Sequence, residues 1–166
     1  MSIGAEQRIL SDTWKRARGV AWMMLAAPAL YVTIGLIFLE HRGRAGLVRL
    51  SPGVSDALLF VFIGASVVCF LLAVVLRRSV LDETYVRRHF RSMGQAAQHY
   101  MHATFLVLSL CEAAAVMGFV YFLLTGNLQR MAILAGAGMA FSVFLFPSRS
   151  KLVRLVQVVK PPEGTT

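Results

Sequence analysis

Four stretches of the chain are long and almost entirely apolar: residues 19–39, 57–76, 103–124 and 131–147. A helix needs about 20 apolar residues to cross the roughly 30 Å hydrocarbon core of a bilayer, and each stretch approaches that length. The pattern therefore predicts an all-α membrane protein, a four-helix transmembrane bundle formed by one integral membrane domain over residues 1–166. Four crossings place both termini on the same side of the membrane.

The start of the first apolar stretch also has features of a secretory signal peptide. Basic residues precede it, and the sequence APA at 27–29 resembles a cleavage site. The apolar run continues beyond this point to Leu39, however, which favours a retained first helix. Pro28 would then lie inside a transmembrane helix, where neighbouring helices can satisfy the freed carbonyl group.

The connecting segments contain signals for turns, caps and short helices. Ser55 or Asp56 is placed to cap the second apolar helix, and Gly126 with Asn127 is placed to stop the third. The segment 77–102 is long for a connection between bundled helices, which indicates that the second or third helix extends into it.

The segment that follows the fourth stretch, SRSKLVRLVQVVK, has a regular polar pattern. Polar residues recur at every third position among leucines and valines. This periodicity is typical of a short amphipathic helix, and its basic side chains favour a position along an anionic membrane surface.

Composition supports the membrane assignment, and the distribution of charge predicts the orientation of the chain across the membrane. Apolar residues make up 57% of the 166 residues and charged residues 15%, which excludes an ordinary soluble domain. Most of the 17 Lys and Arg residues lie in the N-terminal segment, in loop 77–102 or after the fourth stretch. The positive-inside rule therefore predicts a protein of the cell (inner) membrane with both termini and this loop in the cytoplasm.

The net charge of +9 is then mainly a signal of membrane topology. Because the basic residues are divided among three segments that each flank a span, we expect no nucleic-acid partner. The expected partner is the lipid bilayer. The side chains predicted to meet lipid headgroups are Arg77, Arg78, Arg87, Arg88, Arg91, Lys151 and Arg154.

Residues that serve as ligands or nucleophiles form no recognisable catalytic pattern. His99 and His102 could share a helix face, but two ligands do not make a metal site, and no histidine lies within a span as a membrane haem requires. Cys69 and Cys111 lie inside spans, where we expect inert buried thiols. The sequence therefore predicts no enzyme activity, no cofactor and no metal.

One carboxylate, Glu112, lies in the middle of the third apolar stretch. It is about 14 Å into the hydrocarbon core, where an ionised carboxylate costs several kcal/mol. No Lys, Arg or His lies at that depth in the other spans, so the acid is expected to be neutral or paired with another chain. Ser109, one turn earlier, and Ser66, at similar depth in the second span, are candidate hydrogen-bond partners, and with Glu112 they form a candidate proton- or ion-binding set.

Small residues surround this acid and recur in the fourth span. They are Ala113, Ala114, Ala115 and Gly118 in the third span, and Gly136, Gly138 and Ala140 in the fourth. Small side chains let helix backbones approach closely in a membrane. Two interpretations follow: these residues pack the third helix on the fourth, or they form a face that docks against a neighbouring subunit.

The sequence from Leu110 to Leu124, LCEAAAVMGFVYFLL, resembles the carboxylate-bearing helix of ATP synthase c subunits (proteolipids). In both, an Ala follows the Glu, a Gly comes about six residues later, and an aliphatic run completes the helix. The resemblance implies that Glu112 binds a proton or a sodium ion and that Ala113 and Gly118 are packing positions.

Two functions are compatible with these features. The first is a small non-enzymatic membrane subunit or accessory protein that docks within the bilayer through its small-residue helix faces and carries a glutamate at the midplane. Its partner would be another membrane protein or further copies of the chain. The alternative is proton or cation translocation by an oligomer that uses Glu112 as the carrier carboxylate.

Overall fold

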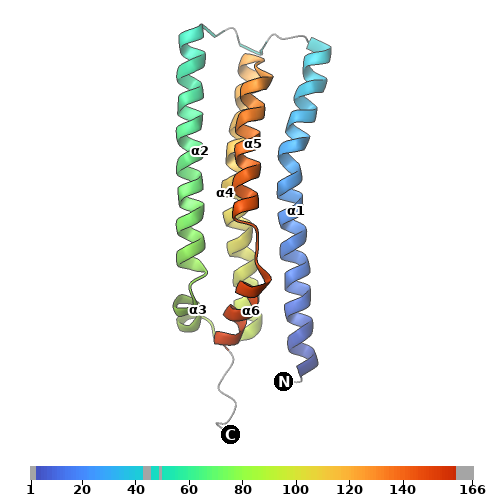
Figure 1. Cartoon of the computed structure of the whole chain (residues 1–166), viewed down its shortest axis with the longest axis vertical. Helices are drawn as coiled ribbons and strands as arrows, with labels where there is room; N and C mark the ends of the chain where they lie inside the picture. The colour runs from blue at the N-terminus through green and yellow to red at the C-terminus, as the bar shows by residue number, and fades with distance from the viewer. Residues whose placement is uncertain (1–2, 43–45, 49, 160–166) are drawn as a thin grey trace.

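The computed structural model describes residues 3–42, 46–48 and 50–159, and nearly all of them are helical (Figure 1). The helices are α1 (Ile3–Arg42), α2 (Pro52–Val80), α3 (Glu83–His89), α4 (Met93–Thr125), α5 (Leu128–Phe144) and α6 (Arg149–Val158). Within these ranges no strand occurs. The prediction of an all-α protein is confirmed.

Three of the helices, α1, α2 and α4, are long and apolar enough to cross a membrane. A fourth candidate span exists if α5 and α6, which are bent by 46° at the break between them, are counted as one. The structure is therefore compatible with a multi-pass membrane protein. α1 runs without interruption through Pro28, whose side chain is buried.

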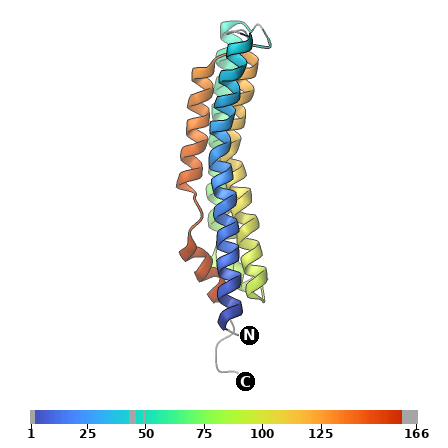
Figure 2. The same cartoon turned by 90° about the vertical axis from the view of Figure 1, so that its right-hand side faces the viewer.

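α4 lies at the centre of the helix packing. It contacts α1, α2 and α5, and α5 also contacts α1. In Figure 1, α1 and α2 lie on opposite sides of the α4 and α5 pair, and in Figure 2 α4 and α5 lie on opposite sides of α1. α1 and α2 therefore each pack on α4, on opposite sides of it.

The α4–α5 turn follows the predicted sequence signals. Gly126 adopts the left-handed conformation with φ of 73°, and its N–H donates to the Phe122 carbonyl at 2.7 Å. The Asn127 side chain then accepts from the N–H of Arg130 at 3.1 Å and caps α5. This turn lies at what we term the loop end, where α1 ends, α2 begins and α4 turns into α5.

Glycine and alanine let α4 and α5 approach closely along their length. A Cβ atom at Gly118 would lie 2.8 Å from the Leu134 Cβ, and one at Gly138 would lie 3.2 Å from the Ala115 nitrogen. Ala114 and Ala115 are also fully buried. Gly118, Gly138 and Ala115 therefore lie in the contact between α4 and α5. In contrast, Gly136 and Ala140 are exposed on α5, and Ala113 is half-buried.

The start of α2 differs from the prediction. The helix begins at Pro52, a favoured first residue, with Ser51 as the N-cap. Ser55 and Asp56 lie inside the helix, and their side chains reach other helices. Before α2, the N–H of Leu47 donates to the Leu123 carbonyl at 2.8 Å, so the chain satisfies a backbone acceptor at the end of α4.

The opposite end, which we term the α6 end, holds α3, α6 and the start of α1 (Figure 1). The predicted extensions are present: α2 continues to Val80, and α4 begins at Met93. Between them, the Asp82 side chain accepts from two backbone N–H groups and caps α3.

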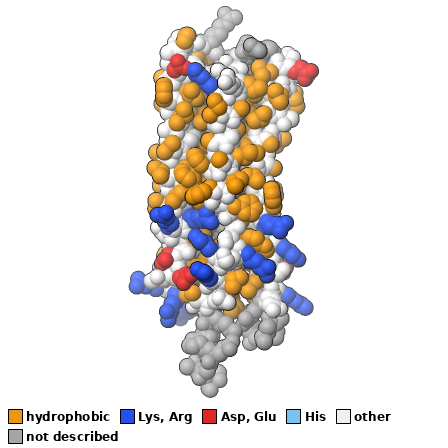
Figure 3. All heavy atoms as spheres, viewed as in Figure 1, with side chains coloured by type: hydrophobic (Ala, Val, Ile, Leu, Met, Phe, Trp, Pro, Cys, Tyr) orange, Lys and Arg blue, Asp and Glu red, His pale blue; other side chains and the backbone are white. Residues whose placement is uncertain are grey.

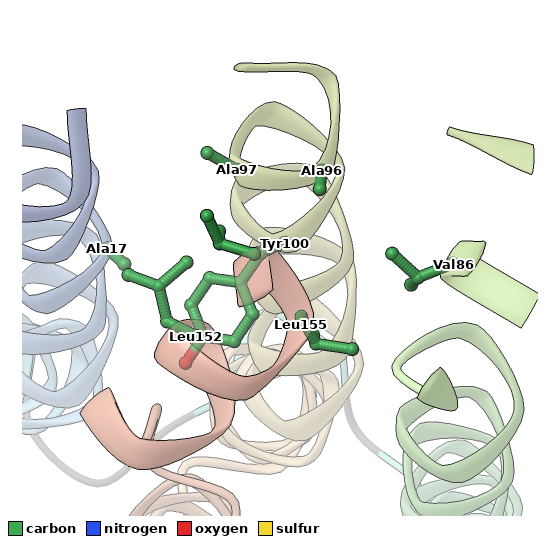
Figure 4. Packing of buried hydrophobic residues seen from close by; sticks show 8 residues of the cluster. Ala17, Val86, Ala96, Ala97, Tyr100, Leu152 and Leu155 are labelled. Carbon is green, nitrogen blue, oxygen red and sulfur yellow. The ribbon is translucent and has the colours of Figure 1, made fainter. Parts of the chain in front are cut away.

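The amphipathic segment is helical as predicted, but its apolar face packs on protein. Figure 4 shows Leu152 and Leu155 of α6 beside the Tyr100 ring of α4, with Ala17 of α1 and Val86 of α3 on either side. The buried cluster comprises Ala17, Val86, Ala96, Ala97, Tyr100, Leu152, Leu155 and Val156. Four helices are thereby joined at the α6 end.

The molecular surface is divided into an apolar part and a basic part (Figure 3). Large apolar side chains are widely exposed, with Met23, Phe60 and Phe144 at 75%, 72% and 73% of their full exposure. Soluble monomers rarely expose contiguous apolar surface of this extent. Lys and Arg gather towards the α6 end in this view. Such a division suits a protein embedded in a bilayer.

The close packing at Gly118 can be tested by comparing substitutions at Gly118 and at Gly136. An added Cβ at Gly136 meets nothing within 4 Å. We expect Gly118→Ala to lower the free energy of unfolding by about 1–3 kcal/mol, because Leu134 must be displaced. Gly136→Ala should raise it by about 0.5–1 kcal/mol through helix propensity. Unfolding in mixed detergent micelles measures both, and equal effects would contradict the described α4–α5 packing.

Candidate functional site

Glu112, the acid in the middle of α4, contacts α1 through a tyrosine. The Tyr31 hydroxyl donates a hydrogen bond of 2.8 Å to Oε1 of Glu112. The Tyr31 ring stacks on Phe119, with 5.5 Å between ring centroids and 25° between planes. Phe119 lies two turns after Glu112 on the same face of α4. The ring contact therefore holds the hydroxyl group at the depth of the carboxyl group.

Neither candidate serine is the partner of Glu112 among the hydrogen bonds of the described residues. The Ser66 hydroxyl donates to the Phe62 carbonyl at 2.7 Å and lies 3.6 Å from Sδ of Met117. Serine in a helix commonly bonds the carbonyl four residues earlier, because the short side chain cannot reach far. A tyrosine is long enough to cross from one helix to the next, and this explains the difference from the expectation.

Glu112 has no ion-pair partner within the described part of the chain, where the one ion pair joins Arg130 and Asp56. Its donor is instead the neutral phenol of Tyr31. A carboxylate oxygen and the carbonyl oxygen of a protonated acid both accept hydrogen bonds. The contact between α1 and α4 is therefore available in either protonation state.

A second polar network lies at the loop end. Tyr121 of α4 is fully buried, and its hydroxyl oxygen lies 2.8 Å from the Ser55 Oγ of α2. Arg130 of α5 donates to the same hydroxyl at 2.8 Å and to Oδ1 of Asp56 at 2.6 Å. The network therefore joins α2, α4 and α5 around one phenol.

A third set of contacts holds the break between α5 and α6. The Tyr100 hydroxyl both donates to the Ser148 carbonyl and accepts from the Ser148 N–H, each at 3.1 Å. Arg77 at the end of α2 donates to the carbonyls of Phe144 and Phe146, at 3.3 and 3.2 Å. These bonds satisfy backbone groups that the end of α5 leaves without helical partners.

α4 thus carries one hydrogen-bonding side chain at each of three levels: Tyr100 near the α6 end, Glu112 in the middle and Tyr121 near the loop end. Each bonds to a different neighbouring element. The arrangement is that of polar contacts that position helices.

Other residues that could support chemistry lie apart from these contacts. Cys69 and Cys111 are free thiols, and Cys111 is buried. His89, His99 and His102 line one open hollow of about 310 Å³ at the α6 end, a grouping that the sequence does not reveal. Over the described residues, no group of three or more His, Cys, Asp or Glu side chains has a geometry suited to a metal ion.

The basic residues expected at lipid headgroups are distributed over the α6 end. Arg77 and Arg78 lie in the last turn of α2, and Arg87 and Arg88 in the last turn of α3. Arg91 lies between α3 and α4, and Lys151 and Arg154 lie on α6. All except Arg77 are exposed.

Comparison of the chain with protein-family models, with curated proteins and with solved structures finds no match.

The contribution of the Tyr31–Glu112 hydrogen bond can be measured by a double-mutant cycle that combines Tyr31→Phe and Glu112→Leu. Cycles for hydrogen bonds between membrane helices average about 0.6 kcal/mol and reach about 1.7, and we expect a coupling free energy in this range. Unfolding in mixed micelles measures each corner of the cycle.

Two further variants serve as controls. Glu112→Gln keeps a side-chain carbonyl oxygen that can accept from Tyr31, so its stability should stay near that of the wild type. Ser109→Ala should show no coupling to Glu112→Leu. Additive effects of Tyr31→Phe and Glu112→Leu would be evidence against the contact.

Proposed function

We propose that this protein is a small non-enzymatic subunit or accessory protein of the cell (inner) membrane that docks against another membrane protein within the bilayer. The observation that carries the proposal is an unused small-residue face on α5. Ala132, Gly136 and Ala140 are all exposed, whereas Gly118 and Gly138 are buried in the α4–α5 contact.

The spacing of the exposed residues favours helix docking. Positions four residues apart lie on one side of a helix, so Ala132, Gly136 and Ala140 form a single row. An added Cβ at Gly136 meets nothing within 4 Å, which leaves room for a partner backbone. Lipid tails are as apolar as leucine, so association in a bilayer depends on close packing, and small residues permit it.

The proposed topology has four crossings with both termini in the cytoplasm. α5 has 17 residues, about 26 Å of helix, and the break before α6 supplies further length. The basic side chains gather at the α6 end (Figure 3), and the positive-inside rule assigns such an end to the cytoplasm.

Glu112 has an internal role in this proposal. Its hydrogen bond from Tyr31 supplies a partner within the same chain, so a second chain is not needed to satisfy the acid. The carboxyl group then stabilises the contact between α1 and α4, and α5 remains free for the partner.

The second candidate function is proton or cation translocation through Glu112 in an oligomer. It is favoured by the half-buried position of this carboxyl group, which has no ion-pair partner in the described part of the chain. The resemblance to proteolipid subunits supports the same role. The acid lies in the first helix of the α4–α5 hairpin, however, whereas those subunits carry it in the second.

The docking proposal is tested by a pair of glycine substitutions. Gly136→Leu on α5 and Gly64→Leu on α2 both place a large side chain at an exposed position with open space around it. We expect Gly136→Leu to abolish association, because the partner backbone can no longer approach, and Gly64→Leu to leave it intact. Extraction in mild detergent followed by mass determination of the complex measures the association.

A wild-type protein that is monomeric under these conditions would contradict the docking proposal. The carrier candidate has a different result: carbodiimide should label Glu112 near neutral pH, and Glu112→Gln should abolish a proton-linked activity while association persists. The docking proposal predicts that Glu112→Gln keeps both the association and the activity of the wild type.

A further inference from the structure

Two basic side chains, Arg77 and Lys151, meet where α2 ends and α6 begins, and Arg78 is the next residue of α2. Arg77 and Arg78 occupy the last turn of α2, and Lys151 lies in the first turn of α6. Arg77 and Lys151 line the same small hollow beside Pro147. The two hydrogen bonds from Arg77 to the α5–α6 break fix its guanidinium group in this place.

These charges repel one another in the described structure. Partial burial lowers the pKa of the Lys151 ammonium group, and the positive charges of Arg77 and Arg78 lower it further. Within the described residues, the one ion pair lies at the loop end between Arg130 and Asp56. The three cations therefore have no acidic counter-ion in the part of the chain that the structure describes.

The position of the three side chains along the membrane normal indicates which anion would neutralise their charges. Arg77 directly follows the apolar stretch 57–76, so it lies at the boundary of the hydrocarbon core. Lys and Arg gather below the apolar surface in Figure 3. Lipid phosphates occupy this level of a bilayer.

An apolar surface adjoins the basic cluster. Leu71, Leu72 and Val75, one to two turns before Arg78 on α2, are 56%, 49% and 58% exposed. A ligand with acyl chains could cover these side chains, whereas a free inorganic anion could not.

From this juxtaposition we propose that Arg77, Arg78 and Lys151 bind the phosphate group of one anionic phospholipid, whose acyl chains lie along α2. Arg77 has five N–H donors and uses two on backbone carbonyls, so three remain for the phosphate oxygens. The bound phosphate neutralises the repulsion and holds α2 against the start of α6. This inference is independent of the proposed docking through α5.

The test compares the wild type with the double variant Arg78→Gln/Lys151→Gln. Neither side chain makes a hydrogen bond or ion pair with the described residues, so the variant retains the packing of the helices. Arg77 is left unchanged because it holds the α5–α6 break. The matched control is Arg87→Gln/Arg88→Gln, which removes the same charge from exposed positions on α3.

Each protein is placed in phosphatidylcholine nanodiscs with and without phosphatidylglycerol, and thermal unfolding and lipid retention by native mass spectrometry are measured. We expect phosphatidylglycerol to raise the unfolding temperature of the wild type and of the α3 control. In Arg78→Gln/Lys151→Gln, retention of phosphatidylglycerol should fall by about tenfold to thirtyfold, since each basic residue near an anionic surface contributes appreciably to binding.

Three outcomes would overturn the proposal. Equal losses in the two double variants would indicate diffuse surface charge rather than a site. Full retention in Arg78→Gln/Lys151→Gln would show that these side chains do not bind the lipid. The third outcome concerns inorganic phosphate, which is added to phosphatidylcholine nanodiscs at constant ionic strength and which we expect to leave the unfolding temperature unchanged. If inorganic phosphate raises the unfolding temperature as phosphatidylglycerol does, the ligand is the free anion and the proposal is wrong.

Discussion

Side-chain hydrogen bonds from α4 to its neighbours hold this helix at the centre of the described structure, because a polar group among apolar residues is costly without a partner. On α4, the side chains of Tyr100, Glu112 and Tyr121 each find a partner on another element. Tyr31 of α1 bonds Glu112, Ser55 and Arg130 bond Tyr121, and the backbone at Ser148 bonds Tyr100. The central place of α4 follows from these contacts together with the small residues that admit α5.

The division of small residues between two faces of α5 connects the packing with the proposed function. Gly138 faces α4 at van der Waals distance, whereas Gly136 faces away with open space around it. Residues two apart on a helix do not share a face. One set of glycines and alanines therefore closes the protein's own hairpin, and the row through Gly136 stays exposed, as the proposed docking requires.

The sequence predicts local features of this protein well and long-range pairings poorly. The first three apolar stretches, the stop at Gly126 and the amphipathic α6 depend on neighbouring residues and are found in the structure, whereas the helix of the fourth stretch ends at Phe144. The partner of Glu112 depends on how α1 and α4 are rotated about their axes, which no local pattern specifies. Tyr31 is near the middle of its own stretch, but whether its phenol faces α4 is decided by that rotation. The burial of α6 likewise requires α1 and α3 in place.

The central claim is that α4 holds α1 and α2 independently, because these two helices lie on opposite sides of it. Amide hydrogen exchange of Glu112→Leu in detergent micelles tests this most directly. Loss of the Tyr31 contact should increase exchange in α1 around Tyr31 and leave the protection of α2 unchanged. Increased exchange in α2 to the same extent, or no change in α1, would contradict the account.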